Sequence, residues 1–180
     1  MFKKMGLLKL GGCVLALGLF NAIINTDDEK ELKKEVQVVE EVKNEIDYNA
    51  LEIEDIEEVI LSVVKEKTNK KKDRIVSIEV SNENYLFVDL NANSYDSTNN
   101  LLTYSSKIYN ELKKFKSAEQ INIVWHAIGI NDTGNEVELE VVKTGFSKEA
   151  LNKINFEKFP TKSYKKYSLP YFVQPGWWIY

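Results

Sequence analysis

Two residue types that occur once each in this chain are the first candidates for chemistry: the cysteine Cys13 and the histidine His126. Cys13 follows Leu10-Gly11-Gly12, and small residues before a cysteine match the pattern at which a cysteine is lipidated and becomes a new N-terminus. His126 follows Trp125, and an imidazole can serve as a general base or a pH sensor. No serine, acid or cysteine stands at a spacing that makes a recognisable triad with it. With one histidine and one cysteine, a structural zinc site of the usual kind cannot be built.

Carboxylates offer two weaker candidates. Asp89 and Asp96 flank a polar stretch with Asn91, Asn93, Ser94 and Asn99, whose oxygens are the ligands that calcium prefers. The glycine and the terminal glutamate of an EF-hand loop are absent, so a plain polar loop is the simpler interpretation. Glu136, Glu138 and Glu140 alternate along one strand pattern and indicate a solvated sheet face. The sequence therefore predicts no catalytic residue, no metal site and no cofactor.

The first 25 residues predict that the protein is located in the membrane or on its outer side. Lys3, Lys4 and Lys9 precede or interrupt an apolar stretch, and acids begin at Asp27. Met5 to Ile24 would give about 30 Å of helix, enough to cross a hydrocarbon core. Lysines before the span and acids after it predict that the N-terminus lies inside and the body outside.

Three interpretations of this segment stay open. It can be an uncleaved anchor, with Lys9 extending its ammonium group to the interface. It can be a lipoprotein signal ending at Cys13, although the residues after Cys13 are apolar. It can be a cleaved secretory signal near Ala22, although Phe20 is bulky for the cleavage site. All three place residues 27–180 on the outer side of the membrane.

The overall charge excludes one class of partner. The net charge of the chain is −4. Without Lys3, Lys4 and Lys9, 21 basic residues face 28 acidic ones, which leaves −7 on the exported part. Because nucleic-acid binding needs a basic footprint, no nucleic-acid partner is expected.

Periodicity predicts the elements that must position these residues. Apolar residues recur at helical spacing over 26–47, where they form a narrow stripe typical of a charged stalk, and over 51–67 and 98–115. Alternating patterns predict strands over 74–81, 85–91, 121–130 and 136–144. The turn sequences Ser81-Asn-Glu-Asn84 and Asn131-Asp-Thr-Gly-Asn135 join these strands into two antiparallel hairpins.

The predicted fold class is α+β. We expect a small antiparallel sheet of about four strands, with two helices packed on one face, after a membrane helix and a stalk helix. The expected organisation is a signal or anchor segment (1–25), a stalk or linker (26–48), an α+β domain (49–155) and a C-terminal tail (156–180).

The tail is rich in lysine and aromatic residues. Its candidates for contact with a partner or a membrane are Tyr171, Phe172, Trp177, Trp178 and Tyr180. Aromatic rings and lysines favour the lipid interface, and aromatic residues are also enriched at protein interfaces. A third interpretation is that the tail wraps across the domain and its rings cover the core.

The layout resembles small lipoproteins or membrane-anchored envelope proteins of low-GC Gram-positive bacteria. The resemblance rests on the lysine-rich start with Leu10-Gly11-Gly12-Cys13, on Tyr85–Leu90 and on Ile121–Trp125. The order helix-strand-strand-helix-strand also looks like the BON-type envelope domain, without its sequence signature. Neither resemblance implies an activity.

These observations favour a non-enzymatic, membrane-tethered, extracytoplasmic protein that binds a protein or another envelope component. The alternatives are a structural subunit of a membrane assembly, such as a secretion or conjugation apparatus, and an unfamiliar hydrolase. A pocket with convergent polar groups around His126 or Asp89 would favour the hydrolase.

Overall fold

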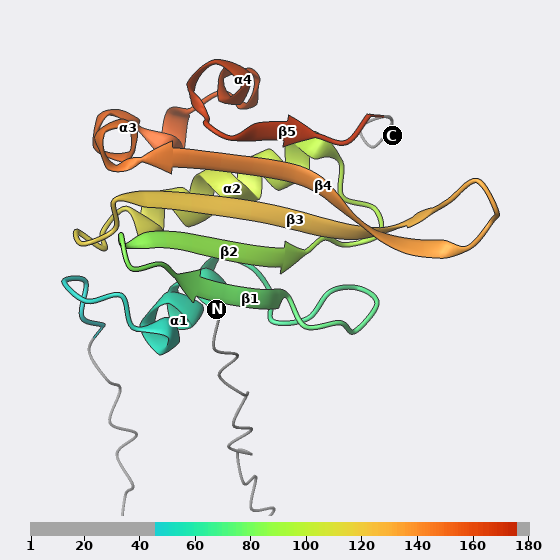
Figure 1. Cartoon of the computed structure of the whole chain (residues 1–180), viewed down its shortest axis with the longest axis horizontal. Coiled ribbons are helices and arrows are strands. Elements are labelled where there is room, and N and C mark those ends of the chain that lie inside the picture. Colours follow the sequence, from blue (N-terminus) through green and yellow to red (C-terminus); the bar gives the residue numbers. More distant parts are fainter. Residues whose placement is uncertain (1–45, 176–180) are drawn as a thin grey trace, which may run out of the picture. The chain divides into compact units, whose positions relative to one another are not determined.

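The computed structural model describes residues 46–175 (Figure 1). Its helices and strands, in chain order, are α1 (Ile53–Val63), β1 (Ile75–Val80), β2 (Tyr85–Asn91), α2 (Thr98–Leu112), β3 (Gln120–Ile130), β4 (Glu136–Ser147), α3 (Lys148–Lys153), the 3-10 helices η1 (Phe156–Lys158) and η2 (Thr161–Ser163), α4 (Tyr164–Tyr167) and β5 (Tyr171–Val173). The predicted α+β class is confirmed.

The sheet has five strands in the order β1-β2-β3-β4-β5. Its hairpins β1–β2 and β3–β4 are antiparallel, but β2 and β3 run parallel. The expectation of a wholly antiparallel, four-stranded sheet is therefore wrong. The reason is the connection: α2 carries the chain back along the sheet before β3 begins, and a returning crossover produces a parallel neighbour.

The start of α2 and the end of α1 have identifiable causes. The Ser97 side chain caps α2 by accepting a hydrogen bond from the amide of Asn100. The helix predicted over 51–67 ends at Val63 instead. Beyond it the backbone is extended, because the amide of Arg74 donates to the carbonyl of Glu66 at 2.7 Å and Lys67 forms an antiparallel bridge with Asp73.

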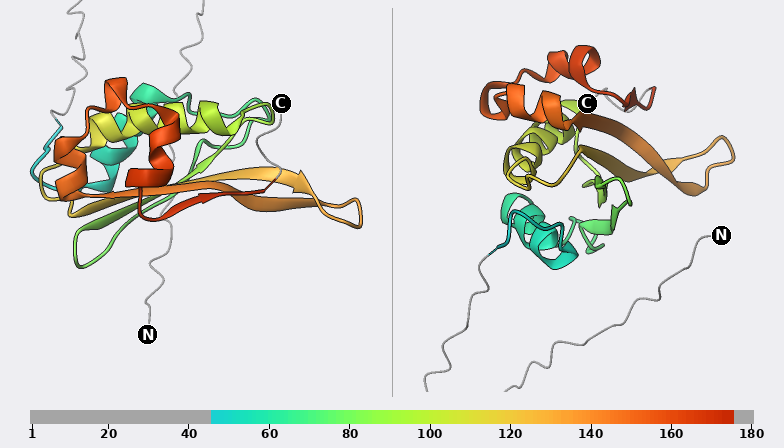
Figure 2. Two further views of the ribbon diagram at one scale, coloured as in Figure 1. Left: turned by 90° about the horizontal axis from the view of Figure 1, so that it is seen from above. Right: turned by 60° about the vertical axis from the view of Figure 1, so that its left-hand side comes forward.

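The helices of residues 46–175 lie on one side of the sheet, and no other element of this range covers the opposite side, which we call the open face (Figure 2). The covered side holds the core, in which polar groups of the aromatic residues are paired. The indole of Trp125 donates to Ser105, and the hydroxyls of Tyr109 and Thr144 are hydrogen-bonded to one another, each at 2.9 Å. The expectation that two helices pack on one face is confirmed for α1 and α2.

The C-terminal segment contributes to both the sheet and the core. β5 pairs with β4 from Tyr171 to Val173, a strand that the sequence did not predict. Phe156 and Tyr164 are buried, and Tyr164 is hydrogen-bonded to Ser106 on α2 at 2.9 Å. Up to Pro175, this segment therefore packs as the interpretation of a covering tail expects.

Several sequence predictions lie outside the described residues. They are the membrane helix, Cys13, nearly all of the stalk, and Trp177, Trp178 and Tyr180. Within residues 46–175, no helix has both the length and the apolar character needed to cross a membrane.

Candidate functional site

The open face of the sheet presents every second residue of the strands to the surface. On β2 these are Tyr85, Phe87, Asp89 and Asn91, while Leu86, Val88 and Leu90 between them are fully buried. Strand register carries this face across the sheet, since directly paired residues point to the same side. Asp89 lies beside Val124 of β3, which lies beside Lys143 of β4, which lies beside Phe172 of β5.

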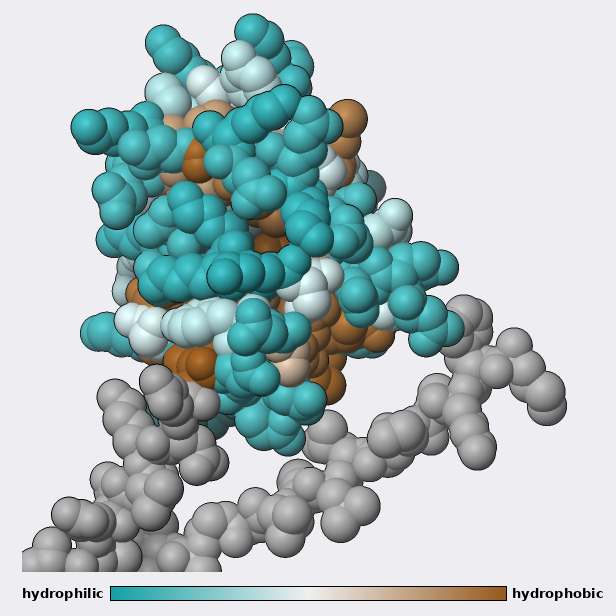
Figure 3. All heavy atoms as spheres, turned by 90° about the vertical axis from the view of Figure 1, so that its left-hand side faces the viewer, coloured by the Kyte–Doolittle hydropathy of each residue, from teal (hydrophilic) through white to brown (hydrophobic). Residues whose placement is uncertain are grey.

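This face has an aromatic half and a charged half. The aromatic half carries the exposed rings of Tyr85 and Phe87, and the exposed ring of Phe172 lies on the edge strand β5, in the same row as Asp89. The charged half carries Asp89, His126, Glu136, Glu138 and Glu140, together with the exposed side chains of Ile128 and Ile130. Hydrophobic areas are visible on the right of Figure 3, toward the open face.

His126 is the centre of the charged half. Its Nε2 lies 3.5 Å from Oδ1 of Asp89, and its Nδ1 lies 3.8 Å from Oε1 of Glu138. The second oxygen of Asp89 accepts a hydrogen bond of 2.8 Å from the hydroxyl of Ser77. Lys72 lies 3.6 Å from the second oxygen of Glu138. Both imidazole nitrogens therefore face carboxylates, and the neighbouring serine bonds to the acid rather than to the base.

A cavity of about 310 Å³ opens beside this cluster. His126 lines it together with Thr68, Lys72, Asn91, Ser94 and Glu136. Polar groups of several kinds therefore surround one space at the edge of the charged half.

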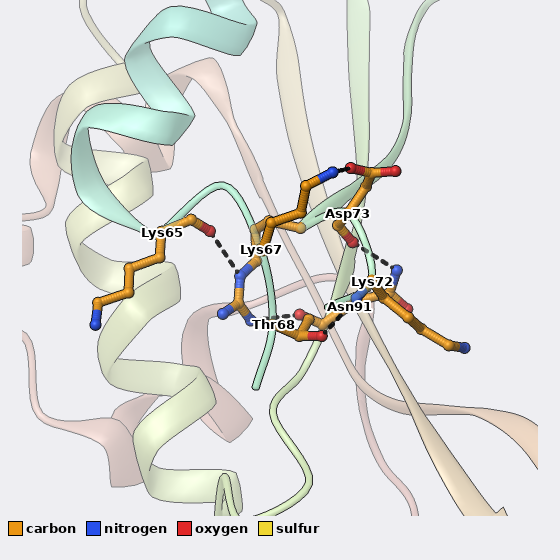
Figure 4. A network of polar contacts seen from close by, with 7 residues as sticks. Lys65, Lys67, Thr68, Lys72, Asp73 and Asn91 are labelled. Atoms are coloured by element: carbon orange, nitrogen blue, oxygen red, sulfur yellow. Dashed lines mark hydrogen bonds and ion pairs between the residues drawn. The ribbon is translucent and has the colours of Figure 1, made fainter. Parts of the chain in front are cut away.

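The loops around the cavity are held by Arg74, the only arginine of the chain. Its guanidinium is buried and donates to the carbonyls of Lys65 and Asn91 and to the side-chain oxygen of Asn93, at 3.2, 2.5 and 3.2 Å. Figure 4 shows the surrounding network, in which Asn91 also donates to the carbonyl of Asp73. Burial lowers the pKa of Arg74, and the charge of Asp96 opposes this shift. Through these hydrogen bonds, the planar guanidinium group of Arg74 holds the loop before β1 against the loop after β2.

The two aspartates of the calcium hypothesis do not share a site. Asp89 lies on the strand and contacts Ser77 and His126, whereas Asp96 accepts a hydrogen bond of 2.8 Å from the amide of Asn93 within its own loop. Across residues 46–175, no three histidine, cysteine or acidic side chains are grouped so that they could hold a metal ion.

The candidates in the C-terminal segment lie on opposite sides of β5. Tyr171 pairs with Thr144, whose side chain points into the core, and burial raises the pKa of Tyr171. Phe172 points to the open face and is exposed.

The sequence missed the grouping of Asp89, His126 and Glu138. Asp89 and His126 are 37 residues apart, and the parallel register between β2 and β3 brings them together. The alternating pattern alone predicts that each residue lies on the polar side of its own strand. It does not predict which strands are neighbours in the sheet.

Comparisons with protein-family models, with curated proteins and with solved structures find no match for this chain.

Proposed function

We propose that this chain is a membrane-tethered, extracytoplasmic module that binds another protein of the envelope through the open face of its sheet. The observation that carries the proposal is this face, where Tyr85 and Phe87 are exposed although Leu86 between them is buried in the core, and where Phe172 is exposed on the edge strand. Exposed aromatic rings are enriched at protein interfaces. The tether is proposed from the N-terminal sequence alone.

Charge indicates the chemistry of the partner. Asp89, Glu136, Glu138 and Glu140 outnumber Lys143 and Lys72 around the charged half. A complementary surface therefore has apolar side chains opposite the aromatic half and basic side chains opposite the charged half.

The arrangement around His126 supports binding rather than catalysis. A serine nucleophile is activated by a hydrogen bond to the base, and the base is oriented by the acid. Here the hydroxyl of Ser77 bonds to Asp89, and His126 lies on the other side of that carboxylate.

Site-specific photo-cross-linking in membranes tests the proposal. A benzophenone amino acid at Phe87 or at Phe172 should give a discrete protein adduct. The same probe at Tyr95 is the matched control, because Tyr95 is exposed but lies in the loop between β2 and α2. Absence of adducts at both open-face positions, or equal adducts at Tyr95, would overturn the proposal. A ladder of stoichiometric adducts would indicate the alternative, a structural subunit of a membrane assembly.

The tether has its own test. Mass measurement of the mature protein in the membrane fraction should find an acylated Cys13 or an intact Met1. A new start near residue 23, or an unprocessed chain in the soluble cytosolic fraction, would contradict the tether.

A hydrolase is the second candidate, because His126 lines a cavity of about 310 Å³ with several polar groups. Ester, amide and phosphoester substrates can be screened with the full chain and with His126→Ala. Turnover that the substitution abolishes, while the folded state persists, would favour the hydrolase over the binding module.

A further inference from the structure

The C-terminal end of the chain carries a net positive charge. From Lys158 to Tyr180 the sequence contains four lysines and no aspartate or glutamate, although the chain as a whole has a net charge of −4. This segregation sets the C-terminal segment apart from the acidic open face.

The structure exposes these lysines along one short stretch. Tyr164 takes the buried position in α4, where it bonds to Ser106, so Lys162, Lys165 and Lys166 on either side remain at the surface. Within residues 46–175, the ion pairs closer than 4.0 Å involve other cations. Lys166 instead lies 4.8 Å from the ring centre of Tyr167. In Figure 3 hydrophilic side chains dominate the upper end of the molecule, where Figure 1 places α4.

An apolar projection lies beside these lysines. Leu169, in the loop between α4 and β5, is 81% exposed, and Tyr167 and Phe172 are exposed near it in the chain. The loop is held in place, because the amide of Leu169 donates to the carbonyl of Gly145 and the hydroxyl of Ser168 accepts from the amide of Gly145, each at 2.8 Å. We call Lys162, Lys165, Lys166, Tyr167 and Leu169 the C-terminal edge.

We propose that the C-terminal edge is a contact surface for anionic lipid headgroups. Lysines attract an anionic leaflet, and their long stems let the ammonium groups reach the headgroups while apolar carbons lie deeper. Tyrosine favours the same interface, and Tyr167 is exposed beside the lysines.

The chemistry of this edge favours lipid over a protein partner. The centre of a protein interface is depleted of charge and packs as densely as a protein interior. The C-terminal edge instead combines three lysines with one projecting leucine. This composition suits the surface of a fluid, anionic lipid leaflet. This inference rests on the proposed tether, since the tether keeps the domain close to a bilayer.

Tryptophan quenching by brominated lipids tests the inference on the full chain. Trp125 is buried in the core, and Trp177→Phe/Trp178→Phe removes the other two tryptophans, so Leu169→Trp in that background places the reporter on the C-terminal edge. The chain is reconstituted into vesicles of brominated phosphatidylcholine, alone or with about one third phosphatidylglycerol. We expect quenching that appears with the anionic lipid and that decreases when salt is raised to about 1 M, where the Debye length is about 3 Å. The quenching should be absent in Trp177→Phe/Trp178→Phe chains that keep Leu169.

Two matched lysine variants locate the contact. Lys162→Gln/Lys165→Gln/Lys166→Gln should lose at least about half of the lipid-dependent quenching. Lys65→Gln/Lys71→Gln/Lys116→Gln removes the same charge from exposed lysines that lie outside both the C-terminal edge and the open face, and it should leave the quenching unchanged. Circular dichroism confirms that both variants are folded.

The outcomes separate this inference from the proposed function. Equal quenching in neutral and anionic vesicles, or equal losses in the two lysine variants, would overturn the lipid contact. Protein adducts from a photo-probe at Leu169, without quenching in pure vesicles, would overturn it in favour of a protein partner. A chain that does not float with vesicles of any composition contradicts the tether itself.

Discussion

The two faces of this sheet are built from the same strands and have opposite properties. The side chains of β2 alternate between Leu86, Val88 and Leu90, which are fully buried under the helices, and Tyr85, Phe87 and Asp89, which face the open side. On β3, Trp125 is enclosed and bonded to Ser105, while its neighbour His126 lies between two carboxylates. The covered face therefore determines stability, and the open face is free to carry function.

The largest predicted effect is a loss of folding stability at alkaline pH, which comes from tyrosines buried on the covered face. Burial raises the pKa of Tyr109 well above its ordinary value, with the nearby Tyr164 adding to the shift. Burial also raises the pKa of Tyr164, against the opposing hydrogen bond from Ser106. Because the folded state keeps these protons longer than the unfolded state, their contribution is complete below about pH 10 and decreases as pH rises from there through the folded-state values.

Tyrosinate absorbance and circular dichroism, recorded together, measure this effect. Two of the nine tyrosines should ionise only as the fold is lost. Ionisation of all nine before any change in circular dichroism would contradict the burial of Tyr109 and Tyr164.

Truncating one aromatic residue on each face gives the next largest difference. Trp125→Ala should lower the free energy of unfolding by about 3–5 kcal/mol, because it leaves a cavity and an unpaired Ser105. Phe87→Ala should cost about 1 kcal/mol or less, because its ring is already exposed. Urea denaturation measures both, and equal losses would mean that the open face is covered.

A pair of glycines tests how tightly each part of the sheet is packed. A Cβ at Gly145 would lie 2.4 Å from Oδ1 of Asn122 and 2.8 Å from Cδ of Pro170, so Gly145→Ala should cost about 1–3 kcal/mol. A Cβ at Gly129 would meet the end of the Leu139 side chain at 2.6 Å. Since that side chain can change rotamer, Gly129→Ala should cost about 1 kcal/mol or less. Thermal unfolding of the two variants compares them, and the reverse order would contradict the close approach of the loop at Pro170.

The smallest effect is expected in the charged half of the open face. Glu138 lies 3.6 Å from Lys72 and 3.8 Å from His126, and it is about half exposed. Glu138→Gln should therefore change the unfolding free energy by about 0.5 kcal/mol or less. If the partner is basic, the same substitution should weaken the photo-cross-link at Phe87. A large loss of stability would mean that the cluster is structural.

Local sequence patterns predict the two hairpins and helix α2 of this fold. Both hairpins follow from alternation and turn residues, and α2 follows from its apolar spacing and the Ser97 cap. Three features depend on distant contacts that no local pattern contains: the parallel pairing of β2 with β3, the end of α1 at Val63, and the addition of β5. The candidate site was missed for the same reason, since His126 meets Asp89 only across the parallel pair.

Arg74 has a practical consequence. Every other basic residue among the 24 is a lysine, so the cation that holds the loops before β1 and after β2 is the one without a primary amine. Reagents that acylate amines can therefore remove the positive charge of the surface lysines while the internal guanidinium stays intact. The carboxylates keep their charge, so acylation offers a way to ask which behaviours of this protein need its surface cations.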